Sequence, residues 1–97
     1  MAQATVLIVD DDPALRRTLQ LRLREEGLRV VDADSAERAL ALLAVELPDL
    51  VVTDVRMGGM DGLALFDEIR RDHPLLPVII LTAHGTIADA EIGRAHV

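Results

Sequence analysis

Four short, largely apolar runs constrain the fold of this chain more than any other feature of its sequence. They occupy residues 4–9, 28–33, 49–54 and 78–81, and each has the length of one β-strand. Valine, isoleucine and leucine dominate them, as is typical of strands covered on both faces. The runs recur about every 25 residues with helical periodicity between them. This alternation predicts right-handed βαβ crossovers and a parallel sheet between two layers of helices.

Polar residues at the ends of the intervening stretches mark where helices begin. Asp12 before Pro13 is the pattern of an N-cap followed by proline at the first helical position. Asp34 followed three residues later by Glu37 has the spacing of a capping box, and Asp61 is placed to cap a third helix. The apolar positions expected to face the sheet are Leu15, Leu19 and Leu23 in the first helix, Ala36, Leu40 and Leu43 in the second, and Leu63, Phe66 and Ile69 in the third.

The composition excludes several classes of protein. The chain has 97 residues, enough for one domain, and 51% of them are hydrophobic, which suits a core that needs no metal or disulfide. Acidic residues outnumber basic ones by 17 to 10, so the net charge of −7 opposes direct binding to nucleic acid or to anionic membranes. Cysteine is absent, and neither an export leader nor a membrane-spanning run is visible, so we expect a cytoplasmic location.

Acidic residues stand at the carboxyl ends of two predicted strands. Asp10 and Asp11 follow the first run and Asp54 ends the third, while Thr82 and the small Ala83 follow the fourth. Ligands of open parallel sheets bind at the carboxyl ends of the strands. If the first and third strands are neighbours, the three carboxylates share one pocket, where their mutual repulsion favours a divalent cation. Hard oxygen ligands that leave room for water or phosphate suit Mg²⁺ better than zinc or copper.

Asp54 is the best placed of these acids for chemistry. It ends a buried strand alone, and residues 57–62 after it are rich in glycine, which lets a phosphoryl donor approach. A carboxylate beside Mg²⁺ can attack phosphorus and form an acyl phosphate. The alternative for any single aspartate is a helix cap or a solvated loop residue. For Asp12, the place before Pro13 favours the cap over the metal site.

Three motifs resemble the receiver domain of bacterial two-component response regulators. They are VLIVDDDP at residues 6–13, VVTDVRMGGMDG at 51–62 and PVIILTAHG at 77–85, and the last two are most similar to receivers of sigma-54-dependent enhancer-binding regulators. The resemblance implies a flavodoxin-like (CheY-like) α/β fold with a doubly wound parallel sheet. It also implies a phosphorylated signalling domain rather than an enzyme. In such proteins the receiver controls a transcription-activating output domain, so transcription regulation is expected of a parent protein.

The resemblance further implies roles for individual residues. A sensor histidine kinase donates its phosphoryl group to the acceptor aspartate of the family, which corresponds to Asp54. The residues implied as holding Mg²⁺ are Asp10, Asp11, Asp54 and, through its backbone carbonyl, Arg56. Thr82 corresponds to the family's switch hydroxyl, and Ala83 lies beside it where the phosphoryl group binds.

The chain departs from this family in two ways. Gly58 stands where the family usually has proline, which loosens the loop after the acceptor. The chain also contains no lysine and ends before the fifth strand, which carries the family's invariant lysine. We therefore expect a receiver domain over residues 1–90 with strand order 2-1-3-4 and the fifth strand missing. We also expect poor phosphorylation, and self-association through the unpaired edge of the 78–81 strand.

The end of the chain does not follow the regular pattern. Residues 86–90 favour the start of a fourth helix. Residues 91–97 match one translation of a common sequencing-library adapter, which suggests a non-native read-through tail.

Two alternative functions remain open at this point. Asp10 and Asp12 form the Asp-x-Asp pair of haloacid-dehalogenase-like phosphatases, in which case the phosphate would be carried by Asp10 rather than Asp54. The missing lysine instead allows a pseudo-receiver that acts by protein contact without phosphorylation.

Overall fold

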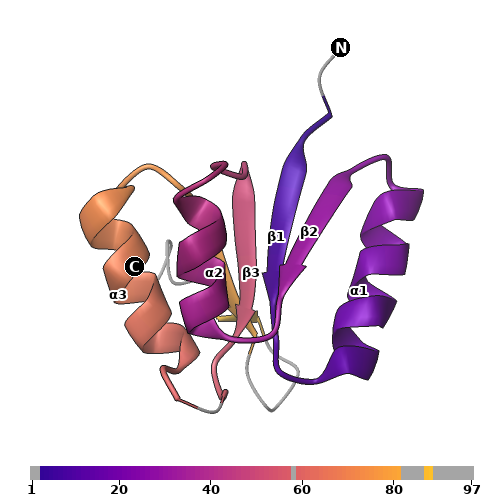
Figure 1. Cartoon of the computed structure of the whole chain (residues 1–97). Coiled ribbons are helices and arrows are strands. Elements are labelled where there is room, and N and C mark those ends of the chain that lie inside the picture. The colour runs from indigo at the N-terminus through magenta and orange to yellow at the C-terminus, as the bar shows by residue number, and fades with distance from the viewer. Residues whose placement is uncertain (1–2, 58, 82–86, 89–97) are drawn as a thin grey trace.

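The computed structural model describes residues 3–57, 59–81 and 87–88, and of the last two only the backbone. Strands and helices alternate along the chain, as expected (Figure 1). Their bounds are β1 Thr5–Val9, α1 Pro13–Glu25, β2 Arg29–Ala33, α2 Ala36–Leu43, β3 Leu50–Asp54, α3 Gly62–Asp72, β4 Val78–Leu81 and β5 Ile87–Ala88. No helix within these described ranges is long and apolar enough to span a membrane.

The sheet has the order β2-β1-β3-β4-β5. Its first four strands are parallel, which confirms the predicted α/β fold and the order 2-1-3-4. The two-residue β5 pairs antiparallel with β4, so it is not the parallel fifth strand that the resemblance implies.

The pairing of β5 corrects two predictions. Residues 86–90 were expected to start a helix, but Ile87 and Ala88 are a strand, and they pair with Leu81 and Ile80 respectively. The edge of β4 is therefore not unpaired at Ile80 and Leu81. The physical reason is that a sheet edge offers backbone donors and acceptors, and pairing with them outweighs a weak, short helical pattern.

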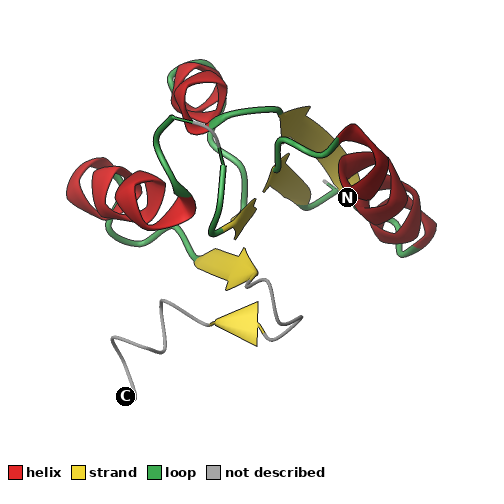
Figure 2. Cartoon of the chain, turned by 90° about the horizontal axis from the view of Figure 1, so that it is seen from below, coloured by secondary structure: helices red, strands yellow, loops and turns green. Residues whose placement is uncertain are grey.

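The helices cover the two faces of the sheet unequally. Figure 2 shows α2 and α3 on one side of the sheet and α1 on the other. The larger core cluster joins α2 and α3 to the sheet through residues such as Leu65, Ile69 and Val51, all fully buried. The smaller cluster lies beneath α1, where Val6 and Ile8 of β1 pack against Leu19 and Leu23. Both faces of β1 are thus buried, which explains its uninterrupted apolar run.

Several predicted helix details need correction. Ser35, not Asp34, is the N-cap of α2, and its hydroxyl accepts from the backbone N–H of Arg38 at 3.1 Å. In α3 the buried leucine is Leu65, whereas Leu63 is 53% exposed. Leu65 is four residues before Ile69 and lies on the same helical face, whereas Leu63 is six residues before it and does not, so the spacing to Ile69 favours Leu65. Leu15 of α1, also expected to face the sheet, is 41% exposed. The predicted caps Asp12 and Asp61 are confirmed.

Candidate functional site

The parallel register brings the predicted acids to one edge of the sheet. Val9 of β1 is paired with Thr53 of β3, so the residues that follow them, Asp10 and Asp54, end neighbouring strands side by side. This edge is the lower one in Figure 1, where the arrows of β1 and β3 end. One carboxylate oxygen each of Asp10, Asp11 and Asp54 lies within 4.8 Å of the others. The predicted three-acid cluster is therefore present.

Asp10 is the buried member of the cluster, with a relative exposure of 2%. Its Oδ1 accepts a hydrogen bond from the backbone N–H of Asp12 at 2.8 Å. Its Oδ2 is buried without a hydrogen-bond partner among the residues that the structure describes. Burial raises the pKa of the Asp10 carboxyl above its ordinary value, against the lowering effect of the Asp12 N–H, and the charges of Asp54, Asp11 and Asp12 raise it further.

This donor set fits a hard divalent cation. Three carboxylates converge on one point, and an unpartnered buried oxygen is a costly feature unless a cation or proton compensates it. Asp11 is exposed and Asp54 only half-buried, so the cluster is open on one side. An open site of oxygen ligands leaves coordination positions for water and for a phosphoryl group, as Mg²⁺ sites do.

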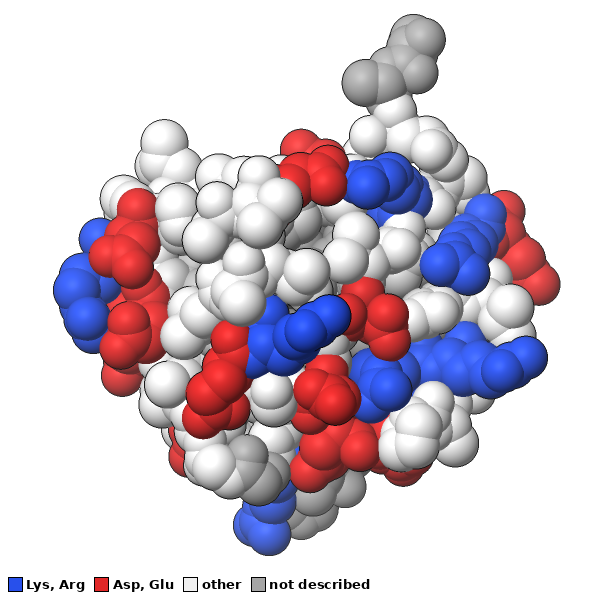
Figure 3. Space-filling view, viewed as in Figure 1, with Lys and Arg blue, Asp and Glu red and all other residues white. Residues whose placement is uncertain are grey.

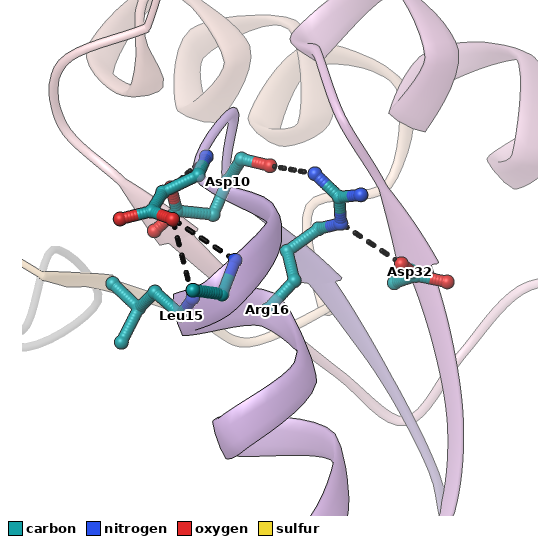
Figure 4. Close-up of polar contacts among 6 residues, drawn as sticks. Asp10, Leu15, Arg16 and Asp32 are labelled. Carbon is teal, nitrogen blue, oxygen red and sulfur yellow. Dashed lines mark hydrogen bonds and ion pairs between the residues drawn. The ribbon is translucent and has the colours of Figure 1, made fainter.

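The β1–α1 loop holds Asp10 in place, and Figure 4 shows its contacts. Asp12 caps α1, because its Oδ1 accepts from the N–H groups of Ala14 and Leu15 at 3.0 and 3.4 Å. This confirms the capping role that was favoured for Asp12. Arg16, in the first turns of α1, donates from Nη1 to the carbonyl oxygen of Asp10 at 2.9 Å. Its Nε donates to Oδ2 of Asp32 on β2, also at 2.9 Å.

Sequence reasoning did not identify Arg16. The available signal was its position four residues after the N-cap Asp12, which places it on the side of α1 above that cap. That spacing alone does not reveal a contact with β2, which lies on another element.

The β3–α3 loop, which follows Asp54, is held by close backbone packing. A Cβ on Gly62 would lie 2.2 Å from the carbonyl oxygen of Asp54, so no other residue fits here without moving the backbone. The N–H of Gly62 donates to the carbonyl of Val55 at 3.0 Å, and the N–H of Val55 donates to Leu81 of β4 at 3.0 Å. These contacts fix where β3 ends and α3 begins.

Glu37 of α2 makes a second, unpredicted contact with this loop. Its Oε2 accepts from the N–H of Met60 at 3.4 Å. The neighbouring Gly59 has a φ of +77°, a conformation that suits glycine, and a Cβ there would lie 3.3 Å from the same oxygen. Gly59 and Gly62 of the predicted glycine-rich loop are thus required by specific backbone positions.

The contacts described above do not test the roles of the other predicted site residues. Arg56 is exposed in the loop after Asp54, and the role of its carbonyl stays a prediction. Thr82 and Ala83 lie outside the described residues, as does Gly58. Leu81, which precedes Thr82, is paired with Asp54 in the sheet.

The charged surface around the site is mixed. In Figure 3 acidic side chains gather toward the lower part of this face, where the strands end, and arginines lie over α1. The basic residues of α1 include Arg16, Arg17, Arg22 and Arg24.

Comparison with known proteins identifies the family. Residues 6–95 match the family model of the response regulator receiver domain. The chain is 54% identical over 87 residues to the transcriptional regulatory protein GlrR of Escherichia coli, covering 90% of this chain and 20% of that protein. It is 44% identical over 87 residues to the DNA-binding transcriptional regulator NtrC of Salmonella typhimurium, covering 90% and 19%. The chain thus spans about a fifth of the length of these curated relatives.

Solved structures agree with this result. The fold matches the crystal structure of the response regulator protein TrrA from Thermotoga maritima in complex with Mg²⁺-BeF, with a TM-score of 0.81 and 37% identity. The match covers 84% of this chain and 70% of that one. The chain therefore belongs to the family of response regulator receiver domains, which are signalling domains of two-component systems.

Proposed function

We propose that this chain is a phosphoacceptor receiver, in which Asp54 takes a phosphoryl group from the phosphohistidine of a sensor histidine kinase. The Mg²⁺ that the reaction needs would be held by Asp10, Asp11, Asp54 and the backbone carbonyl of Arg56. The observation that carries the proposal is the buried Asp10 carboxylate, whose unpartnered oxygen lies in a cluster with Asp11 and Asp54. The Mg²⁺-BeF complex of TrrA supports the same ligand chemistry for a related domain.

The acceptor step follows from the position of Asp54. Its carboxylate attacks phosphorus, the P–N bond of the phosphohistidine breaks with its electron pair returning to the imidazole, and an acyl phosphate forms on Asp54. An ionised carboxylate needs no base to make this attack. Bound Mg²⁺ supplies charge neutralisation for the phosphoryl oxygens. Thr82 and Ala83, which follow β4, would contact those oxygens, Thr82 through its hydroxyl.

The longer relatives suggest the biological setting. They are named as transcriptional regulators, and this chain spans about a fifth of their length. We propose that phosphorylation here controls a transcription-activating output domain of a longer cytoplasmic protein. The net charge of −7 disfavours direct nucleic-acid binding by this chain. Self-association through the edge of β4 would use Val78 and Ile79, because β5 already pairs with Ile80 and Leu81.

The test is phosphorylation of the chain by a small acyl-phosphate donor and by a histidine kinase, with the label located by mass spectrometry. We expect a Mg²⁺-dependent label on Asp54 that is lost in Asp54→Ala and retained in Asp67→Asn, a control that changes an exposed carboxylate of α3. Label on Asp10 would favour the phosphatase alternative. That alternative needs Asp12 as its general acid/base, whereas here Asp12 caps α1. No label under any condition would favour the pseudo-receiver.

The 97 residues contain no lysine, which bears on the rate expected of this chain. Loss of one preorganised stabiliser of transition-state charge commonly costs about 10²–10³ in rate. We therefore expect phosphotransfer to be slower by roughly this factor than in a version of the chain extended through a lysine-bearing fifth strand. Equal rates in the two versions would contradict the proposed effect of the lysine.

A further inference from the structure

Among the residues that the structure describes, Arg16 is the one arginine that links three elements at the acidic edge of the sheet. It stands on α1, its Nη1 donates to the carbonyl oxygen of Asp10 at the end of β1, and its Nε donates to Asp32 on β2. Figure 4 shows the guanidinium between these two acceptors. The Arg16 side chain is only 19% exposed, whereas that of Asp32 is 39% exposed. The guanidinium is therefore held in one orientation, partly shielded from water.

We infer that Arg16 is a positioning residue for the metal site, acting on the backbone of Asp10 rather than on the ion. The inference rests on the proposed Mg²⁺ function of the acidic cluster. Arg16 holds the Asp10 carbonyl, and the side chain of Asp10 is in turn held by the N–H of Asp12 at 2.8 Å. Together these two bonds fix both the backbone and the carboxylate of the buried ligand. Groups that orient metal ligands in this way typically contribute tenfold or more to metal affinity.

The geometry requires the planar fork of arginine. Nη1 and Nε of one guanidinium donate to two acceptors, one just after β1 and one on β2, at the same distance of 2.9 Å. A lysine ammonium is a compact charge at the end of a flexible stem, and it does not present two donors in fixed, divergent directions. Arg16→Lys therefore keeps the charge but loses the bridge between β1 and β2.

The sign of the effect separates positioning from simple electrostatics. A positive charge near three carboxylates disfavours binding of Mg²⁺, so removing that charge alone tightens binding or leaves it unchanged. Loss of positioning instead weakens binding, because Asp10 no longer keeps its place in the cluster. Arg17, the next residue of α1, is exposed and carries the same charge, which makes Arg17→Gln the matched control.

The experiment measures the Mg²⁺ dissociation constant of the folded chain by calorimetric titration, well below the melting temperature of every variant. We expect Arg16→Lys and Arg16→Gln to bind Mg²⁺ about tenfold more weakly than the unsubstituted chain. Arg17→Gln should bind as tightly as the unsubstituted chain, or more tightly. If Arg16→Gln fails to fold, Arg16→Lys and Asp32→Ala carry the test, because the first removes the paired donors and the second removes the acceptor on β2.

A second measurement follows the backbone N–H of Asp12 in ¹⁵N-resolved NMR spectra without metal. Its resonance reports the bond to Asp10 Oδ1, which a purely stabilising role of Arg16 would leave unchanged. We expect this resonance to move in both Arg16 variants and not in Arg17→Gln. Unchanged Mg²⁺ affinity in Arg16→Lys, or an unmoved Asp12 resonance, would overturn the inference. Failure of the unsubstituted chain to bind Mg²⁺ at all would instead overturn the proposed function, and the inference with it.

Discussion

Replacing Asp10 by asparagine should stabilise the metal-free chain. The carboxylate is almost fully buried, and its Oδ2 has no hydrogen-bond partner among the described residues. Asparagine keeps an oxygen for the N–H of Asp12, removes the buried charge, and presents an amide donor to the neighbouring carboxylates. An unsatisfied buried polar group costs about 1–3 kcal/mol. We expect Asp10→Asn to raise the free energy of unfolding by about 1–2 kcal/mol at neutral pH, or roughly 5–15 °C in melting temperature.

The pH dependence of this gain follows from the direction of the pKa shift. The pKa of Asp10 is raised in the folded chain, mainly by burial, so the folded state holds the proton more tightly than the unfolded state. The stability that Asp10 contributes is therefore present below its ordinary pKa of 3.8 and is lost as the pH rises through the higher folded value. The advantage of Asp10→Asn should be largest at neutral pH and should disappear on acidification.

Urea unfolding followed by circular dichroism, in a chelator and in Mg²⁺, measures both effects. Mg²⁺ at a hundred times its dissociation constant adds about 2.7 kcal/mol to the unsubstituted chain, so the order of stability should reverse there. Asp67→Asn controls for the loss of one negative charge at an exposed position. If the stability gain of Asp10→Asn is independent of pH, or if Asp10→Asn loses stability in the chelator, the description of Asp10 as a buried carboxylate with an unpartnered oxygen is refuted.

Four further substitutions test the packing around the site by thermal and urea unfolding. Asp12→Ala should cost about 1 kcal/mol through the lost cap of α1 while leaving the stabilisation by Mg²⁺ unchanged, and a lost Mg²⁺ response would place Asp12 among the ligands. Gly62→Ala should cost about 1–3 kcal/mol or more, because its Cβ meets the backbone of Asp54, and a neutral result would show that the loop yields easily. Leu65→Ala should cost about 2–5 kcal/mol and Leu63→Ala less than about 0.5 kcal/mol, and similar values would contradict the buried face of α3.

The site was predictable from sequence to the extent that it depends on strand order. Asp10, Asp11 and Asp54 each lie at or just after the end of a buried strand, and the parallel crossover rules bring such ends together. The capping role of Asp12 was predictable because it depends only on local spacing and on Pro13.

What the sequence could not predict depends on contacts between elements. The burial of Leu65 depends on how α3 packs on the sheet, although its four-residue spacing to Ile69 was a signal that favoured it over Leu63. The choice of Ser35 over Asp34 as a cap turns on a shift of one residue. The bonds of Arg16 to Asp32 and of Glu37 to Met60 cross between elements, and no periodicity encodes them. The strand at Ile87 and Ala88 likewise depends on an edge supplied by β4.

The packing of Gly62 on Asp54, the proposed acceptor, limits how a conformational change at Asp54 can reach α3. The loop between them is closed at its base by the hydrogen bond from Gly62 to Val55, and the glycine has no side chain to serve as a compressible spacer. A displacement of the Asp54 backbone can therefore be accommodated in two ways. In the first, the loop between Val55 and Gly62 changes its conformation and α3 stays in place. In the second, α3 moves together with the end of β3 as a rigid body. Comparing amide exchange in α3 with exchange in this loop, before and after phosphorylation, would show which of the two movements occurs.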